Sequence, residues 1–387
     1  MTVVLCFLAT VVEGIDLLAI GLAAPAIGAD FELAKAQVGL VFSATTVGMM
    51  IGAVIGGRLG DQIGRKRVLS VSVLTFGLFT FATAFSSDFS SLALMRFLTG
   101  LGIGGAMPMI ATIASDIARP GQRAFVGTLM FCGLPVGGIL AAMIAGVFPV
   151  DENWKNIFYV GGVTPLVLAA IIVALLPETS RTLATSDAPQ ALPPRQAIFG
   201  DGRLKTTVFV WGAYGATLVV TYLLLNWLPS LIVIKGFSSA QGAQASLGFT
   251  FGSLFGALGL GLSVTRFGLR IPMTVMYAVT AGAILGLAGA TSMRDVILYS
   301  ALGGAGASGT QFLLYAVTPG FYPANARGTG VGFSVAVGRI GAIVGPLYAG
   351  VILSGGGGIS AVVTAILPVI AVAALCVFLL SYQPSED

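Results

Sequence analysis

Four ionisable side chains interrupt long apolar stretches of the sequence: Glu13, Asp16, Arg96 and Arg339. Glu13 and Asp16 are three residues apart, so on a helix they lie on one face. Burial in an apolar environment favours the protonated form of a carboxyl group. An arginine can bind a carboxylate through two parallel hydrogen bonds. These residue types therefore predict proton binding combined with recognition of an organic anion.

The charge balance of these four residues supports that prediction. With both acids ionised, two negative and two positive charges cancel, and an entering carboxylate leaves one net negative charge in a medium of low dielectric constant. Protonation of one acid restores neutrality and frees an arginine. We expect Asp16, with Glu13, to carry the proton and Arg339 or Arg96 to bind the anion. The alternative is that acids and arginines only neutralise one another and hold helices together.

The composition indicates which elements must carry these charges. Of the 387 residues, 56% are hydrophobic and 9% are charged, whereas soluble domains contain about 25% charged residues. A soluble globular enzyme and a disordered chain are therefore excluded. The apolar residues form unbroken runs and not alternating strands of about 10 residues, which argues against an outer-membrane barrel. The chain is predicted to be an all-α integral membrane protein.

Other chemistries lack the residues that they need. The sequence has no histidine, and its three cysteines are far apart within apolar runs, so it offers neither imidazole ligands nor a disulfide framework. No nucleotide-binding signature is present. We expect no metal, no cofactor, no enzymatic activity and no nucleic-acid partner.

Twelve segments are apolar over the roughly 20 residues that a spanning helix needs. They lie near 2–27, 36–57, 68–86, 91–117, 124–148, 156–176, 206–234, 242–264, 272–290, 295–318, 328–353 and 359–380. The first begins close to Met1 and lacks the basic region and cleavage site of a signal peptide, so we expect it to be a membrane span.

The loops predict the orientation. The connections on one side carry thirteen basic residues and those on the other carry four: Lys35, Lys155, Lys235 and Arg294. Basic loops face the cytoplasm. We therefore expect a bacterial inner-membrane protein with both termini and the polar loop 177–205 in the cytoplasm.

The second half of the chain repeats the first. An offset of 204 residues places Pro25 on Pro229 and Gly64 on Gly268, and it matches the segment beginning at Arg123 to that beginning at Arg327 at 6 of 25 positions. We expect two parallel six-helix repeats, a bundle of residues 1–176 and a bundle of residues 206–387, joined by the linker 177–205. Two such bundles can expose a midplane site alternately to either side of the membrane.

The loop between the second and third spans carries a motif. Residues 56–67 read GGRLGDQIGRKR, in which Asp61 can pair with a neighbouring arginine or a helix N-terminus. The pattern resembles the loop signature of the major facilitator superfamily, which implies a conformational latch formed by Asp61, Arg65 and Arg67. The second-half counterpart has Thr265 in place of the acid, so its latch is expected to be weaker.

Further motifs resemble the aromatic acid:proton symporter family, and within it the 3-(3-hydroxyphenyl)propionate transporters. They are Cys6-Phe7-Leu8, Glu13-Gly14-Ile15-Asp16, the run RFLTGLGIGGAMP from Arg96 to Pro108, Leu129-Met130-Phe131-Cys132-Gly133, Asn226-Trp227-Leu228-Pro229, and the stretch from Tyr322-Pro323 to Gly345-Pro346. The resemblance covers nearly the whole chain. It implies that spans 1, 4, 7 and 10 line a central cavity.

The resemblance also implies roles for individual residues. An arginine at the position of Arg96 is associated with proton coupling, which leaves Arg339 as the preferred anion-binding group; Arg339 aligns with Pro135 in the repeat. The remaining candidates for substrate binding are Tyr222, Asn226, Trp227, Gln311, Tyr315 and Phe131. Each of them is also a plausible packing residue between helices.

We therefore expect a monomeric secondary transporter whose partners are protons, a small aromatic acid and the lipid bilayer. Import of the acid with protons is the leading prediction. A proton-coupled efflux antiporter is the alternative, because Gly133-Leu134-Pro135-Val136-Gly137-Gly138 partly resembles a motif associated with antiporters. A receptor or scaffold that does not transport would not need four charges within its spans.

Overall fold

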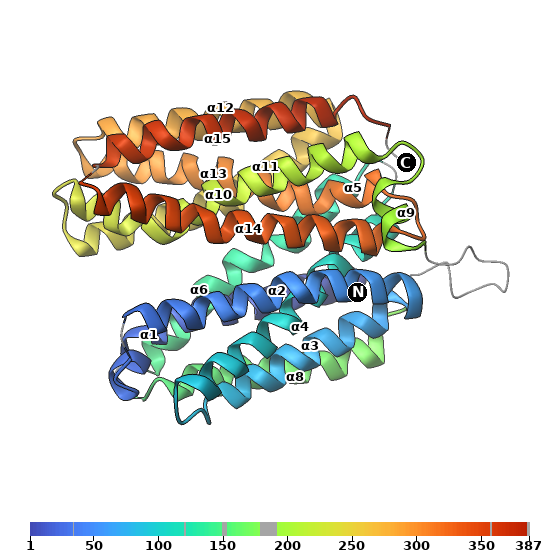
Figure 1. Cartoon of the computed structure of the whole chain (residues 1–387), viewed down its shortest axis with the longest axis horizontal. Helices are drawn as coiled ribbons and strands as arrows, with labels where there is room; N and C mark the ends of the chain where they lie inside the picture. Colours follow the sequence, from blue (N-terminus) through green and yellow to red (C-terminus); the bar gives the residue numbers. More distant parts are fainter. Residues whose placement is uncertain (34, 120, 149–152, 179–191, 357, 385–387) are drawn as a thin grey trace. The chain divides into compact units, whose positions relative to one another are not determined.

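A computed structural model describes residues 1–33, 35–119, 121–148, 153–178, 192–356 and 358–384. Within these residues the secondary structure is helical, without a strand (Figure 1). Residues 179–191 of the linker expected at 177–205 lie outside the described residues. They include Arg181, one of the thirteen basic loop residues used to predict the orientation.

The first half of the chain contains α1 (Thr2–Asp30), α2 (Lys35–Ile63), α3 (Arg65–Thr83), α4 (Phe89–Ile117), α5 (Arg123–Phe131), α6 (Gly133–Val147) and α8 (Lys155–Leu175). The short helix α9 (Pro194–Phe199) follows. The second half contains α10 (Leu204–Ile234), α11 (Ser239–Phe267), α12 (Arg270–Gly289), α13 (Met293–Val317), the 3-10 turn η2 (Thr318–Phe321), α14 (Arg327–Ser354) and α15 (Ile359–Leu380).

Eleven helical segments of the described chain are long and apolar enough to cross a membrane, with α5 and α6 counted as one segment. The remaining expected span, 295–318, corresponds to α13, which has 25 residues. Its lower hydropathy comes from glycines and from buried polar side chains such as Ser300, Thr310 and Gln311. Polar groups buried within a membrane helix are commonly functional or bridge to neighbouring helices.

The helices follow the internal repeat closely. The offset of 204 residues carries α2, Lys35–Ile63, onto α11, Ser239–Phe267, with both ends in register. Asp88 accepts a hydrogen bond from the backbone N–H of Ser91 and caps α4, and this bond lowers the pKa of the Asp88 carboxyl group. The equivalent residue, Ser292, caps α13. Helix ends are thus specified by the same positions in both repeats.

Close packing is repeated as well. A Cβ atom added to Gly100 of α4 would collide with the carbonyl oxygen of Thr45 in α2, and one added to Gly304 of α13 would collide with that of Phe249 in α11. Both pairs of residues are related by the same offset. Small residues let membrane helices approach closely enough for their backbones to touch, so the two repeats use one packing scheme.

The fifth span of the first half is broken at Cys132, between α5 and α6. Pro135 has no N–H group to donate to the carbonyl of residue 131, and its ring crowds the preceding turn. The hydroxyl group of Thr10 in α1 lies within hydrogen-bond distance of the Met130 carbonyl oxygen and supplies a donor at the break. In the equivalent span, α14 continues through Arg339, which replaces Pro135.

The chain forms two compact units. The first comprises Met1–Ala118, Met130–Ile198 and Tyr322–Ala336; the second comprises Arg119–Leu129, Phe199–Phe321 and Val337–Asp387. The beginning of α14 therefore packs in the first unit, where Gly328 lies against Gly57 of α2, and the beginning of α5 packs in the second, where Gly127 lies against Ala316 of α13.

Candidate functional site

A buried ion pair lies at the centre of the first unit. The guanidinium group of Arg96 in α4 donates two parallel hydrogen bonds to the carboxylate of Asp16 in α1, from Nη1 to Oδ1 at 2.9 Å and from Nη2 to Oδ2 at 2.7 Å. Both side chains are 0% exposed. Thr80 of α3 donates a further hydrogen bond from its hydroxyl group to Oδ1 of Asp16, at 2.6 Å.

An aromatic ring and a second buried acid lie near this pair. The Arg96 guanidinium lies over the ring of Phe158 in α8, 5.9 Å from its centroid. Glu13 is fully buried one turn before Asp16 on α1. Apolar residues of similar volume can hold helices together as well as a buried ion pair does. Removal of one partner alone lowers the free energy of unfolding strongly, because it leaves a buried charge without compensation.

The second repeat has no equivalent of this arrangement. The offset of 204 residues replaces Asp16 by Val220, Arg96 by Ser300, Thr80 by Ile284 and Glu13 by Thr217. The ion pair and the two neighbouring polar residues therefore have no charged counterpart at the equivalent positions of the second repeat. This asymmetry is expected if the two repeats have different tasks in one transport cycle.

Arg339 forms the corresponding polar centre of the second unit. Its side chain is 1% exposed. Nη1 of Arg339 donates a hydrogen bond to the hydroxyl group of Tyr222 in α10, and the guanidinium lies 5.8 Å from the centroid of that ring. The sequence placed both residues among the substrate-binding candidates, and the structure brings them together. A guanidinium group oriented by a tyrosine can bind a carboxylate.

The other residues predicted to bind substrate have separate contacts. Asn226 is exposed and donates a hydrogen bond from its amide group to the carbonyl oxygen of Tyr222. The indole N–H of Trp227 donates to the carbonyl oxygen of Pro346 in α14, at 2.9 Å. The amide group of Gln311 donates to the hydroxyl group of Tyr315 at 3.1 Å, and both side chains are buried in α13. Phe131 is fully buried in the first unit.

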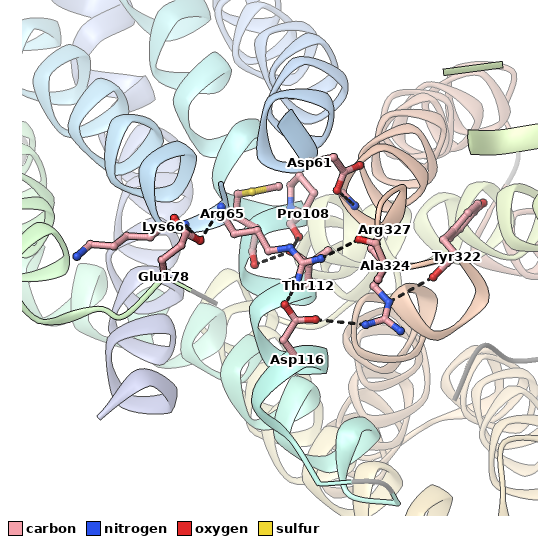
Figure 2. A network of polar contacts seen from close by, with 12 residues as sticks. Asp61, Arg65, Lys66, Pro108, Thr112, Asp116, Glu178, Tyr322, Ala324 and Arg327 are labelled. Atoms are coloured by element: carbon pink, nitrogen blue, oxygen red, sulfur yellow. Dashed lines mark hydrogen bonds and ion pairs between the residues drawn. The ribbon is translucent and has the colours of Figure 1, made fainter. Parts of the chain in front are cut away.

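A second polar cluster joins helix ends of the first unit, and Figure 2 shows it. Oδ1 of Asp61 accepts a hydrogen bond from the backbone N–H of Gly328 at 2.9 Å. Oδ2 of Asp61 accepts two from Thr329, from the backbone N–H at 2.7 Å and from the hydroxyl group at 2.8 Å. These N–H groups belong to the first turn of α14 and have no partner within the helix. The carboxylate at the end of α2 therefore caps α14.

The basic residues of this cluster share one acid. The carboxylate of Asp116, at the end of α4, lies between the guanidinium groups of Arg65 and Arg327 and forms an ion pair with each (Figure 2). Arg65 also donates to the carbonyl oxygen of Ala324 at 3.3 Å. Glu178 accepts hydrogen bonds from the backbone N–H groups at the start of α3. We call Asp61, Arg65, Asp116, Glu178 and Arg327 the helix-end cluster.

Sequence reasoning identified part of this cluster. Asp61 and Arg65 were expected from their motif, whereas Arg67 is exposed at the start of α3. Asp116 and Glu178 were missed, although both are acids directly beyond an apolar run, which is a usable signal. In the second repeat the counterpart of Asp61 is Thr265, and its hydroxyl group donates a hydrogen bond to the carbonyl oxygen of Leu262 in the same helix.

Comparison with known proteins defines the class of this chain. Residues 6–298 match the model of the Major Facilitator Superfamily. The chain therefore belongs to this superfamily of membrane transporters, as expected from its motifs, and it is a multi-pass transporter and not an enzyme.

Relatives and a solved structure agree with this assignment. The 3-(3-hydroxy-phenyl)propionate transporter of Escherichia coli (strain K12) is 40% identical over 386 residues, which cover 100% of this chain and 95% of the relative. The 4-hydroxybenzoate transporter PcaK of Acinetobacter baylyi is 32% identical over 99% of this chain and 91% of its own length. The proton:xylose symporter XylE has the same fold, with a TM-score of 0.84, 16% identity and coverage of 100% of this chain and 96% of XylE.

Proposed function

We propose that this protein imports aromatic carboxylic acids together with protons by alternating access. The observation that carries the proposal is the bidentate ion pair between Asp16 and Arg96, which is fully buried within membrane-spanning helices. The two relatives named for 3-(3-hydroxyphenyl)propionate and 4-hydroxybenzoate support an aromatic carboxylate as the substrate class.

The proposed cycle follows from charge balance. In the empty protein the Asp16 carboxylate is neutralised by Arg96. A proton from outside binds Asp16, with Glu13 as the second acid of the same helix face. The positive charge that this proton uncovers compensates the carboxylate of the incoming substrate, because an unbalanced charge is unfavourable in a medium of low dielectric constant. Release of the substrate and the proton inside restores the ion pair.

We assign recognition of the substrate carboxylate to Arg339, oriented by the hydroxyl group of Tyr222. An aromatic substrate also needs apolar walls and a few hydrogen-bonding groups. We assign those roles to the remaining candidates: Asn226, Trp227, Gln311, Tyr315 and Phe131. Arg96 acts in proton coupling, because its guanidinium group is engaged by Asp16.

Conformational change is assigned to the two six-helix bundles, residues 1–176 and 206–387. We propose that the contacts of Asp61 with the start of α14 and of Arg65 with Ala324, just before that helix, form in one conformation and break in another, with Arg67 contributing positive charge to the same loop. We further propose a monomer in a bacterial inner membrane with cytoplasmic termini. The thirteen to four distribution of basic loop residues supports this orientation.

Uptake assays in cells or proteoliposomes test the proposal. We expect accumulation of labelled 3-(3-hydroxyphenyl)propionate, 4-hydroxybenzoate or benzoate that collapses when a proton uncoupler is added. Asp16→Asn should abolish accumulation against a gradient and retain exchange of substrate across the membrane, since an amide resembles a protonated acid. The matched control is Asp295→Asn in the first turn of α13, where the amide oxygen can still accept the hydrogen bond from Ser292; it should leave uptake unchanged.

Two outcomes contradict the proposal. Undiminished accumulation by Asp16→Asn would remove Asp16 from proton coupling. Proton-dependent extrusion in place of uptake would favour the efflux antiporter, which the helix break before Pro135 makes a specific alternative.

A further inference from the structure

Thr80 holds an unusual position in the proton-binding site of the first unit. Its side chain is fully buried in α3, and its hydroxyl group donates to Oδ1 of Asp16 at 2.6 Å. The same oxygen accepts from Nη1 of Arg96 at 2.9 Å. Two other hydroxyl groups of α3 bond to their own helix: Ser70 donates to the carbonyl oxygen of Lys66, and Thr83 to that of Phe79.

The two partners of Asp16 differ in their hydrogen-bonding chemistry. A guanidinium group has only donors, whereas a hydroxyl group both donates and accepts. When the carboxylate takes up a proton, the new O–H group needs an acceptor, and Arg96 cannot provide one. The oxygen of Thr80 can accept that hydrogen bond after a rotation of its own O–H bond. Thr80 can therefore remain bonded to Asp16 in both protonation states.

We propose that Thr80 is a positioning residue that keeps Asp16 hydrogen-bonded before and after proton uptake and thereby sets the external pH at which transport is half-maximal. The inference rests on the proposed function, because it assumes that Asp16 is the group that carries the proton. The equivalent position of the second repeat is Ile284. The fold shared by the two repeats therefore does not require a hydroxyl group at this position.

The ionisable groups around this site are few. On α1 they are Glu13, Asp16, the buried thiol Cys6 and, at the helix end, Asp30; on α4 they are Arg96 and the helix-end residue Asp116. Helix α6 has none, α8 has Tyr159 and, at its start, Lys155, and α2 and α3 carry theirs near their ends: Lys35, Arg58, Asp61, Arg65, Lys66 and Arg67. Glu13 and Arg96 are thus the charged residues that share the helix interiors with Asp16, and Cys6 and Tyr159 are the neutral titratable ones.

The direct test is the variant Thr80→Val, which replaces the hydroxyl group by a methyl group of similar size. A hydrogen bond donated to a carboxylate is stronger than one accepted from the neutral acid. Its loss therefore favours the protonated form, and the external pH of half-maximal uptake should rise by about one unit. Proton release inside becomes harder, so the maximal uptake rate should fall. Thr80→Ser should restore the wild-type pH profile.

Thr83→Val is the matched control. It makes the same substitution one turn away on α3, at another fully buried threonine, and removes only a hydrogen bond within the helix. It should lower stability without moving the pH profile. Substrate exchange, which needs no net proton movement, should be retained by Thr80→Val.

Three results decide the matter. An unchanged pH profile in Thr80→Val, or an equal shift in Thr83→Val, overturns the role of Thr80 and leaves the proposed function intact. Wild-type uptake that does not respond to pH or to an uncoupler overturns the proposed function as well. If Thr80→Val does not reach the membrane, Thr80→Ala compared with Thr80→Ser is judged by the same criterion.

Discussion

At the scale of single residues, the charges of this transporter are divided between the repeats. The acid and arginine pair, Asp16 and Arg96, has apolar or neutral counterparts in the second half, and Arg339 has Pro135 as its counterpart in the first. The pair of Asp16 and Arg96 is thus buried in the first unit, and Arg339 is buried in the second. The groups proposed to bind the proton and the anion can therefore be altered separately by substitution.

Tyr222→Phe tests the proposal that Arg339 binds the substrate carboxylate. The substitution removes the hydroxyl group that accepts a hydrogen bond from Arg339. The guanidinium group then loses an orienting partner worth about 1 kcal/mol, so the KM for uptake should rise about fivefold. The pH profile should stay that of the wild type. Initial rates measured over a range of substrate concentrations give the KM.

The control for that prediction is Tyr348→Phe, which alters an exposed tyrosine of α14. Its KM should equal that of the wild type. A Tyr222→Phe variant with an unchanged KM would remove this pair from substrate recognition.

Some of these residues could be predicted from sequence and others could not. Asp16, Arg96 and Arg339 are conspicuous because a charge within an apolar span is expensive. Thr80 carries no such signal, since threonines are frequent in these spans and most bond to their own helix. The pairing of Arg339 with Tyr222 depends on how α10 packs against α14, which spacing along one helix cannot specify.

At the scale of helices, the carboxylate of Asp61 substitutes for the missing acceptors at the start of α14. The first turn of a helix carries unpaired N–H groups and a partial positive charge, which a carboxylate stabilises. Asp116 adds ion pairs with Arg65 and Arg327 at the same end of the first unit. The ends of α2, α3, α4 and α14 are therefore joined by charge and hydrogen bonds and not by apolar packing alone.

Asp61→Ala should destabilise the protein. It leaves two buried N–H groups and one hydroxyl group of the α14 start without their acceptor, at a cost of about 1–3 kcal/mol. The thermal unfolding midpoint of the purified transporter should fall measurably. Thr265→Ala, at the equivalent position of the repeat, should leave the midpoint nearly unchanged, because that hydroxyl group bonds only within its helix. Equal midpoints for the two variants would contradict the capping role of Asp61.

Helix positions were largely predictable, because runs of apolar residues and the repeat determine them. The break at Cys132 was marked in the sequence only by Pro135 and its glycines. Its counterpart, α14, has glycines as well and contains Pro346, yet it continues without a break. A proline removes a helix hydrogen bond, but its presence in the sequence does not by itself specify whether the helix breaks there.

At the scale of the whole molecule, one packing scheme serves both repeats. Gly100 and Gly304 occupy equivalent positions, and each touches the backbone of the neighbouring helix at equivalent residues, Thr45 and Phe249. The offset found in the sequence therefore describes how helices pack within each repeat as well as where they begin and end. The positions of close packing are the same in the two repeats, whereas the side chains of the candidate site differ between them.

Gly100→Ala and Gly304→Ala test this common frame. In each variant the added methyl group would collide with a backbone carbonyl, which a rotamer change cannot relieve. Such overpacking costs about 1–3 kcal/mol, so both variants should unfold at lower temperature than the wild type, and by similar amounts. Gly215→Ala and Gly282→Ala are the controls, because a Cβ atom at either position meets nothing within 4 Å. Alanine favours a helix over glycine by about 1 kcal/mol, so these two variants should unfold at an equal or higher temperature. Destabilisation of only one variant of the first pair would show that the repeats have diverged in packing as well as in chemistry.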